Sequence, residues 1–128
     1  MKILGIGVDL IENKRIGNLI NNKSFIKRTF GKKEVNLAKK SSNKINYYAK
    51  RFAAKEAFAK SLGTGFRDNL NFKDIQILND KIGKPYFFKS KKINKIIIKK
   101  FKVKKFDLFL SISDEKDYSV AFTIIQKV

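Results

Sequence analysis

Two carboxylates and one lysine are the side chains of this sequence whose types and positions suit a shared chemical site. Asp9 ends a short apolar segment that contains Gly5 and Gly7, while Glu56 and Lys60 lie four residues apart in an alanine-rich segment. Two nearby carboxylates repel each other unless a cation lies between them. Mg²⁺ is commonly held by one or two carboxylates together with water and substrate phosphates. If the two segments pack together, we expect a magnesium site at Asp9 and Glu56, with the Lys60 ammonium beside it.

Each of these side chains also has an ordinary structural explanation. Glu56 and Lys60 have the spacing of a surface ion pair on a helix, which is worth about 0.3–0.5 kcal/mol. Asp9, at the end of a strand, can cap the helix that follows it. Residues 63–65 can be a helix C-cap followed by a turn, and residues 80–85 can be a hairpin turn. Ser111 and Ser113 can be plain positions in a sheet. The spacing alone leaves both explanations open.

The composition excludes several kinds of site. The 128 residues include no His and no Cys. Disulfides, zinc sites made of Cys or His, thiol nucleophiles and catalytic Ser/His or Cys/His arrangements are therefore ruled out. Any metal must be held by oxygen atoms, which favours a hard cation such as Mg²⁺.

The charge is strongly positive, with 30 Lys and Arg against 11 Asp and Glu, a formal net charge of +19. Such a charge suits a nucleic-acid-binding module, which would bind DNA or RNA in a salt-dependent way without Mg²⁺. Only four of the cations are Arg, although Arg is the residue that favours bidentate phosphate and base-edge recognition. The basic residues are also scattered along the chain, so we expect an acidic partner rather than nucleic acid.

Apolar residues make up 43% of the chain, which is enough for the core of one small domain spanning residues 1–128. No apolar run approaches the roughly 20 residues of a membrane span. The first residues lack a long apolar block and a small-residue cleavage site, so they do not resemble a signal peptide. We expect a cytoplasmic protein that does not bind membranes.

The hydrophobic periodicity predicts an α+β fold. A strand is expected at 3–11, with glycines and Asp9 on one face, and the best helix at 46–62, ended by Gly63. Alanines at i, i+4 spacing in this helix can pack closely against the glycine face, which would bring Asp9 and Glu56 together. The remaining expected elements are helices at 12–22, 32–40 and 91–100, a hairpin of 72–78 with 84–88, and a hairpin of 106–113 with 118–126.

Four segments together resemble the holo-acyl-carrier-protein synthase family, the small bacterial 4′-phosphopantetheinyl transferases. Its first motif is similar to residues 5–9 followed by Arg15 and Ile16. Its second and most specific motif is similar to residues 51–60 followed by residues 63–65. The turn at 80–85 and the stretch Ser111-Ile112-Ser113-Asp114 complete a resemblance that covers essentially the whole chain.

The resemblance implies a small single domain in which a mixed antiparallel sheet packs on one long helix, assembled as a homotrimer with active sites between subunits. It implies a Mg-dependent transfer of 4′-phosphopantetheine from coenzyme A to a serine of apo acyl carrier protein, for fatty acid synthesis, with release of 3′,5′-ADP. The implied magnesium ligands are Asp9 and Glu56, which form the catalytic set with Lys60 near the reacting phosphate. The implied coenzyme A site consists of Arg51, Lys60, Gly83, Lys84, Pro85 and Ser113.

The implied partner is an acidic carrier protein, and complementary charge raises the rate of encounter. Arg15 matches a basic residue on the family's docking helix, and the surrounding basic region consists of Lys14, Arg15, Lys23, Lys27 and Arg28. One position departs from the family, because many members have His where this chain has Asp114, although others have Asp. A relative that binds the carrier without modifying it is therefore an alternative to the active transferase.

Overall fold

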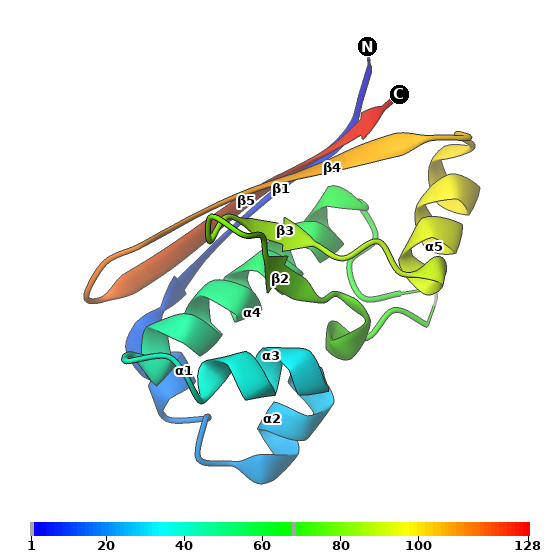
Figure 1. The fold of residues 1–128 in the computed structure, drawn as a ribbon. Helices are drawn as coiled ribbons and strands as arrows, with labels where there is room; N and C mark the ends of the chain where they lie inside the picture. The colour runs from blue at the N-terminus through cyan, green and yellow to red at the C-terminus, as the bar shows by residue number, and fades with distance from the viewer. Residues whose placement is uncertain (1, 68) are drawn as a thin grey trace.

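The computed structural model describes residues 2–67 and 69–128. A long helix lies along one face of a three-stranded sheet, with three short helices at one end of this pair and a fourth at the other end (Figure 1). In chain order the elements are β1 (Lys2–Glu12), α1 (Asn13–Gly17), α2 (Lys23–Thr29), α3 (Lys32–Ala38), α4 (Lys44–Ser61), the 3₁₀ helix η1 (Phe72–Asp74), β2 (Ile77–Asn79), β3 (Pro85–Phe87), α5 (Lys91–Phe101), β4 (Phe106–Asp114) and β5 (Tyr118–Lys127). The predicted α+β class is confirmed.

The strands form two antiparallel sheets. The larger sheet has the order β1-β5-β4, so the last strand lies between the first and the fourth. Asp9 is paired with Ala121 in this sheet, and Ser113 is paired with Val120. The smaller sheet consists of β2 and β3. The hairpin expected at the end of the chain is confirmed as β4 and β5.

The helix α4 begins at Lys44, two residues before the predicted start, because the Asn43 side chain accepts a hydrogen bond from the Asn46 amide at 3.1 Å. Such an N-cap satisfies an amide that has no partner within the helix. Just after the helix, Gly63 has a φ of +79°, which a glycine adopts without steric cost. The predicted C-terminal end is therefore confirmed.

Two predicted elements were wrong in extent. The helix expected at 12–22 covers only Asn13–Gly17, and a new helix, α2, begins after Asn22, whose side chain accepts from the Phe25 amide at 3.1 Å. Asn competes for backbone hydrogen bonds, which favours turns and caps over the interior of a helix. The strand expected at 72–78 starts as the helix η1, because the Asp74 carboxylate accepts from the Asn71 amide at 2.8 Å and closes a turn there.

The strand β1 lies unusually close to α4. A Cβ atom added at Gly7 would lie 1.9 Å from the carbonyl oxygen of Ala57, and one added at Gly5 would lie 1.9 Å from that of Ser61. The helix alanines Ala49, Ala53 and Ala57 are fully buried. The predicted packing of small helix residues on a glycine face is therefore confirmed where the two glycines meet Ala57 and Ser61.

The opposite face of the three-stranded sheet is apolar and exposed. Three residues of β1 on this face, Ile6, Val8 and Leu10, are 61%, 52% and 64% exposed. Phe122 on β5 and Phe109 on β4 continue the same face, because Val8 is paired with Phe122 and Phe109 is paired with Ile124. We call these five residues the outer sheet face.

Among the described residues, no helix has the length and hydropathy that crossing a bilayer requires.

Candidate active site

Asp9 and Lys60 meet where β1 crosses α4. The Lys60 Nζ donates to Asp9 Oδ1 at 3.1 Å and to the carbonyl oxygen of Val8 at 3.0 Å. The Asp9 side chain is mostly shielded, with 15% exposed, whereas the Lys60 side chain is 55% exposed. The helix after β1 starts at Asn13, so Asp9 does not cap it. In the part of the chain that the structure describes, no ion pair joins Lys60 to Glu56, and the surface-pair explanation is therefore wrong.

Glu56 shares this location. Its partial burial raises the pKa of the Glu56 carboxyl, and the negative charge of Asp9 raises it further, while Lys60 and Arg15 lower it. An influence of Asp9 on Glu56 requires the two carboxylates to be near each other. Two carboxylates and two cations, contributed by β1, α1 and α4, therefore meet at one site, as the sequence predicted for Asp9, Glu56 and Lys60.

The donor set of this site fits a magnesium ion. Among residues 2–67 and 69–128, no group of three or more acidic, His or Cys side chains is placed to bind a metal. A metal at Asp9 and Glu56 would therefore take two protein carboxylates and complete its shell with water and substrate oxygens, which is the usual arrangement for Mg²⁺. Burial is the main cause of the raised pKa of Glu56, and the charge of Asp9 adds to it; a divalent cation between the two carboxylates would offset this second contribution.

Arg51 lies on a different side of α4, about 140° around the helix from Glu56 at 100° per residue. Its guanidinium is buried, stacks 3.9 Å above the Tyr47 ring, and donates from Nη2 to the Asn79 side chain at 2.5 Å. Burial lowers the pKa of Arg51 and raises the pKa of Tyr47 to about 12. Within the described residues, Arg51 Nε has no hydrogen-bond partner. The buried Nε is therefore an unsatisfied donor, and the guanidinium charge lies beside the turn that contains Gly83.

The turn between β2 and β3 lies next to Arg51 through Asn79, whose amide also donates to the carbonyl oxygen of Gly83 at 2.9 Å. Asp80 Oδ1 accepts from the amides of Ile82 and Lys84 at 3.0 and 2.9 Å, and Gly83 has a φ of +87°. The segment is therefore the hairpin turn that its sequence predicted. Its rigid geometry presents Lys84, which is exposed.

Ser113 and Asp114 lie at the end of β4. Ser113 is exposed on the side of the sheet that carries the outer sheet face, because it is paired with Val120 and thus with the side of β1 opposite Asp9. The Asp114 carboxylate accepts from the Asn46 side chain at 2.8 Å and lies 3.9 Å from the Lys50 ammonium. Within the described residues, no hydrogen bond or ion pair joins Ser113 to Asp9 or to Arg51.

The predicted site residues thus fall into three groups in a single chain. Asp9, Glu56 and Lys60 form the first, which we call the carboxylate cluster. Arg51 and the turn that contains Gly83, Lys84 and Pro85 form the second, which we call the hairpin cluster. Ser113 lies apart from both.

Three residues near the hairpin cluster were missed by the sequence reasoning. Asn79 fixes Arg51, and a fully buried ion pair joins Lys55 to Glu34 at 2.7 Å. The sequence carried a signal for this pair, because Glu34 is the only acid from residue 13 to residue 55. Lys55 also falls one turn after Arg51 on the same side of the helix.

Comparison with known proteins places this geometry in a family. Residues 5–123 match the profile of the 4′-phosphopantetheinyl transferase superfamily. The holo-[acyl-carrier-protein] synthase of Pelagibacter ubique (strain HTCC1062) is 62% identical over 127 residues, which cover 99% of both chains.

Solved structures agree. The crystal structure of the holo-[acyl-carrier-protein] synthase from Neisseria meningitidis has a TM-score of 0.86 and 38% identity, and the match covers 98% of this chain and 100% of that one. A holo-(acyl-carrier-protein) synthase from Bacillus anthracis, in complex with CoA (3′,5′-ADP), has a TM-score of 0.81 and 34% identity over 98% of each chain.

Proposed function

Because this chain belongs to the holo-[acyl-carrier-protein] synthase family of the 4′-phosphopantetheinyl transferase superfamily, we propose that it moves the phosphopantetheine group of coenzyme A to a serine of apo acyl carrier protein. The leaving product is 3′,5′-ADP, and the holo carrier serves fatty acid synthesis in the cytoplasm. The observation that carries the proposal is the carboxylate cluster, in which α4 and β1 bring Glu56, Lys60 and Asp9 together. Residues 1–128 act as one transferase domain, which is supported by the single hydrophobic core.

Asp9 and Glu56 hold Mg²⁺ in this proposal. When bound, the ion supplies charge neutralisation on the pyrophosphate oxygens of coenzyme A. The Lys60 ammonium, more than half exposed beside Asp9, stabilises or protonates the departing phosphate. Since the chain has no His, the proton of the carrier serine goes to Glu56 or to a water molecule. The raised pKa of Glu56 brings this carboxylate nearer to the range in which a general base works well.

The hairpin cluster, with Lys60 and Ser113, binds coenzyme A. The charge of the buried Arg51 guanidinium and the exposed Lys84 ammonium provide a positive field for its phosphates. The Bacillus anthracis relative is described in complex with CoA, which supports this substrate. Gly83 and Pro85 shape the turn that presents Lys84.

We propose a homotrimer whose active sites lie between subunits. The outer sheet face exposes a contiguous group of large apolar residues, which in a protein surface marks an interaction site. Ser113 lies on this same side of the sheet, whereas the carboxylate cluster lies on the other. A coenzyme pocket that uses Ser113 and the carboxylate cluster together is more readily assembled from two neighbouring chains than from one.

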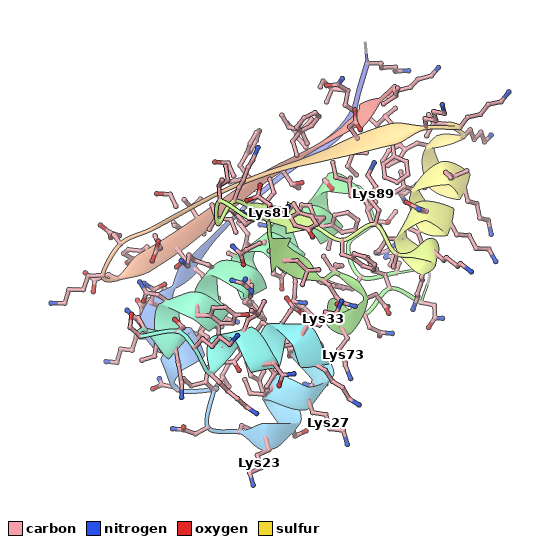
Figure 2. The ribbon with its side chains drawn as sticks, viewed as in Figure 1. Lys23, Lys27, Lys33, Lys73, Lys81 and Lys89 are labelled. Atoms are coloured by element: carbon pink, nitrogen blue, oxygen red, sulfur yellow. The ribbon has the colours of Figure 1, made fainter. Side chains whose placement is uncertain are left out.

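The carrier protein docks on α1 and α2. All five cations of the expected docking region are exposed, and Lys23 and Lys27 project outward from α2 (Figure 2). No acid occurs between Glu12 and Glu34, so the charge of this surface is not offset locally. Arg15 also lowers the pKa of Glu56, so its helix α1 lies near the carboxylate cluster, which supports docking on α1. An acidic carrier is the partner that complements this surface.

One assay separates the active transferase from its alternatives. The protein is incubated with coenzyme A, Mg²⁺ and apo acyl carrier protein, and the carrier is then weighed by mass spectrometry. We expect a gain equal to the mass of the phosphopantetheine group. Carrier binding without a mass gain would point to an inactive relative. Tight salt-dependent binding of DNA or RNA, again without a mass gain, would favour the nucleic-acid-binding module.

A further inference from the structure

The buried ion pair between Lys55 and Glu34 lies outside both clusters and has no part in the reaction described above. Both side chains are completely buried, and the Lys55 Nζ lies 2.7 Å from Glu34 Oε1. Burying two charges is costly unless their hydrogen-bonding capacity is fully used. Lys55 also donates to the carbonyl oxygens of Phe72 and Ile75, so all three of its N–H donors have acceptors.

Glu34 extends the same network to a third segment. Its Oε1 accepts from the Gly31 amide at 3.0 Å, and its Oε2 accepts from the Ile77 amide at 3.3 Å. Its carbonyl oxygen accepts from the Tyr47 hydroxyl at 2.5 Å. The pair therefore joins α3, α4 and the segment 72–77 at one buried point.

The ion pair is connected to the hairpin cluster through the short strand β2. Ile77, held by Glu34, is the first residue of β2, and Asn79 is the last. Asn79 then bonds both to Arg51 and to Gly83. Arg51 and Lys55 lie one turn apart on α4. The helix therefore binds the segment 72–79 at two places: Arg51 bonds Asn79 in the hairpin, and Lys55 bonds the carbonyl oxygens of residues 72 and 75 just before it.

The carboxylate cluster depends on different contacts. Its geometry follows from the close packing of Gly5 and Gly7 on Ala57 and Ser61, across from the ion pair. Loosening the pair should therefore move the hairpin and Arg51 more than it moves Asp9 and Glu56. Such a difference separates a positioning role from a general contribution to stability.

We propose that Lys55 and Glu34 are positioning residues for the coenzyme: their buried pair clamps the segment 72–77 onto α4 and so holds the hairpin cluster in the geometry that binds coenzyme A. This inference rests on the proposed function, which assigns coenzyme binding to that cluster. A pair of apolar residues could fill the same space without a loss of stability, but it would not bond the carbonyls and amide that fix the hairpin.

The test compares the double variant Lys55→Met/Glu34→Gln with the wild-type protein. Removing both charges avoids the unpaired buried charge that would unfold a single variant. We expect the double variant to melt cooperatively, to bind coenzyme A about tenfold more weakly, and to keep its kcat and its KM for the carrier within about twofold, as expected when a ground-state contact to one substrate is weakened. Calorimetric titration with coenzyme A gives the same readout without turnover.

The control is Lys92→Met. It removes a more exposed ion pair, in which Lys92 of α5 lies 2.6 Å from Asp74 in the segment 72–77. This variant should keep wild-type affinity for coenzyme A. If the double variant fails to fold, Lys55→Met/Glu34→Met, an apolar pair that also leaves no unpaired buried charge, carries the same expectation. Wild-type coenzyme A affinity in the folded variant, or equal losses for both substrates, would overturn the inference. If the wild-type protein leaves the carrier unmodified, the proposed function fails, and the calorimetric comparison still decides the role of the pair.

Discussion

Replacing Gly7 by alanine tests whether the close approach of β1 to α4 builds the carboxylate cluster. The added Cβ would lie 1.9 Å from the carbonyl oxygen of Ala57 and 2.9 Å from the Ser61 amide nitrogen, both of them backbone atoms that cannot turn aside. Ordinary contacts begin near 3.4 Å, so strand and helix must separate by about 1.5 Å. Overpacking of this kind costs about 1–3 kcal/mol.

The separation also has a catalytic consequence, because Asp9 moves with β1 whereas Glu56 and Lys60 move with α4. A displacement of about 1 Å can cost on the order of 100-fold in rate. We therefore expect Gly7→Ala to lower the melting temperature and to reduce carrier modification by about 100-fold, beyond what the fraction unfolded explains. Thermal denaturation and the mass-spectrometric carrier assay, both run on the same preparation, measure the two effects.

The matched control is Gly31→Ala, where the nearest atoms to the new Cβ belong to the Gln76 side chain and lie at an ordinary contact distance of 3.5 Å. This variant should keep wild-type turnover. If Gly7→Ala is as stable and as active as the wild-type protein, the cluster does not depend on the close packing of β1 on α4.

Four further predictions concern single side chains. Asp9→Ala should abolish turnover at saturating Mg²⁺ while circular dichroism shows a folded protein; full turnover would remove the metal assignment. Glu56→Gln should raise the melting temperature at neutral pH without Mg²⁺, because the raised pKa of Glu56 means that ionising it costs stability as pH rises. This gain should vanish below about pH 4, where the carboxyl is neutral in both folded and unfolded protein; a gain that persists there contradicts the pKa argument. Arg15→Glu should raise the KM for the carrier more than the KM for coenzyme A, and equal effects would count against docking on α1. Val8→Glu should shift the sedimentation coefficient from that of a trimer to that of a monomer, since it places charge on the outer sheet face; an unchanged assembly would mean that this face is not the interface.

The carboxylate cluster could be predicted because small residues in a strand and in a helix indicate that the two pack closely. Gly5 and Gly7 in a strand and alanines at i, i+4 in a helix limit how the two segments can meet. A local signal likewise located the end of α4 at Gly63, which has a positive φ, whereas the predicted start was two residues late because the Asn43 cap was missed. The end of α4 depends on neighbours in sequence, and the meeting of β1 with α4 on two complementary small-residue patterns, so the sequence carried both.

Contacts between distant segments could not be predicted in the same way. The pair of Lys55 and Glu34 spans 21 residues and two helices. The lack of another acid from residue 13 to residue 55 limits the possible partners, but it does not show that the two side chains meet in the core. The packing of the glycine face of β1 on α4 was predicted, but the exposure of its more apolar face, with Ile6 and Val8, was not. Periodicity identifies the two faces of a strand, but it does not say which large apolar residues remain exposed in a single chain.

The order of the strands has a consequence for how the protein is made. Among the described strands, β1 is paired with β5 alone, although about 100 residues lie between them. At about 5–20 residues per second on the ribosome, the strand that carries Asp9 waits roughly 5–20 s for its sheet partner to emerge. During that interval a nascent chain exposes an apolar strand edge, which is the kind of segment that chaperones protect.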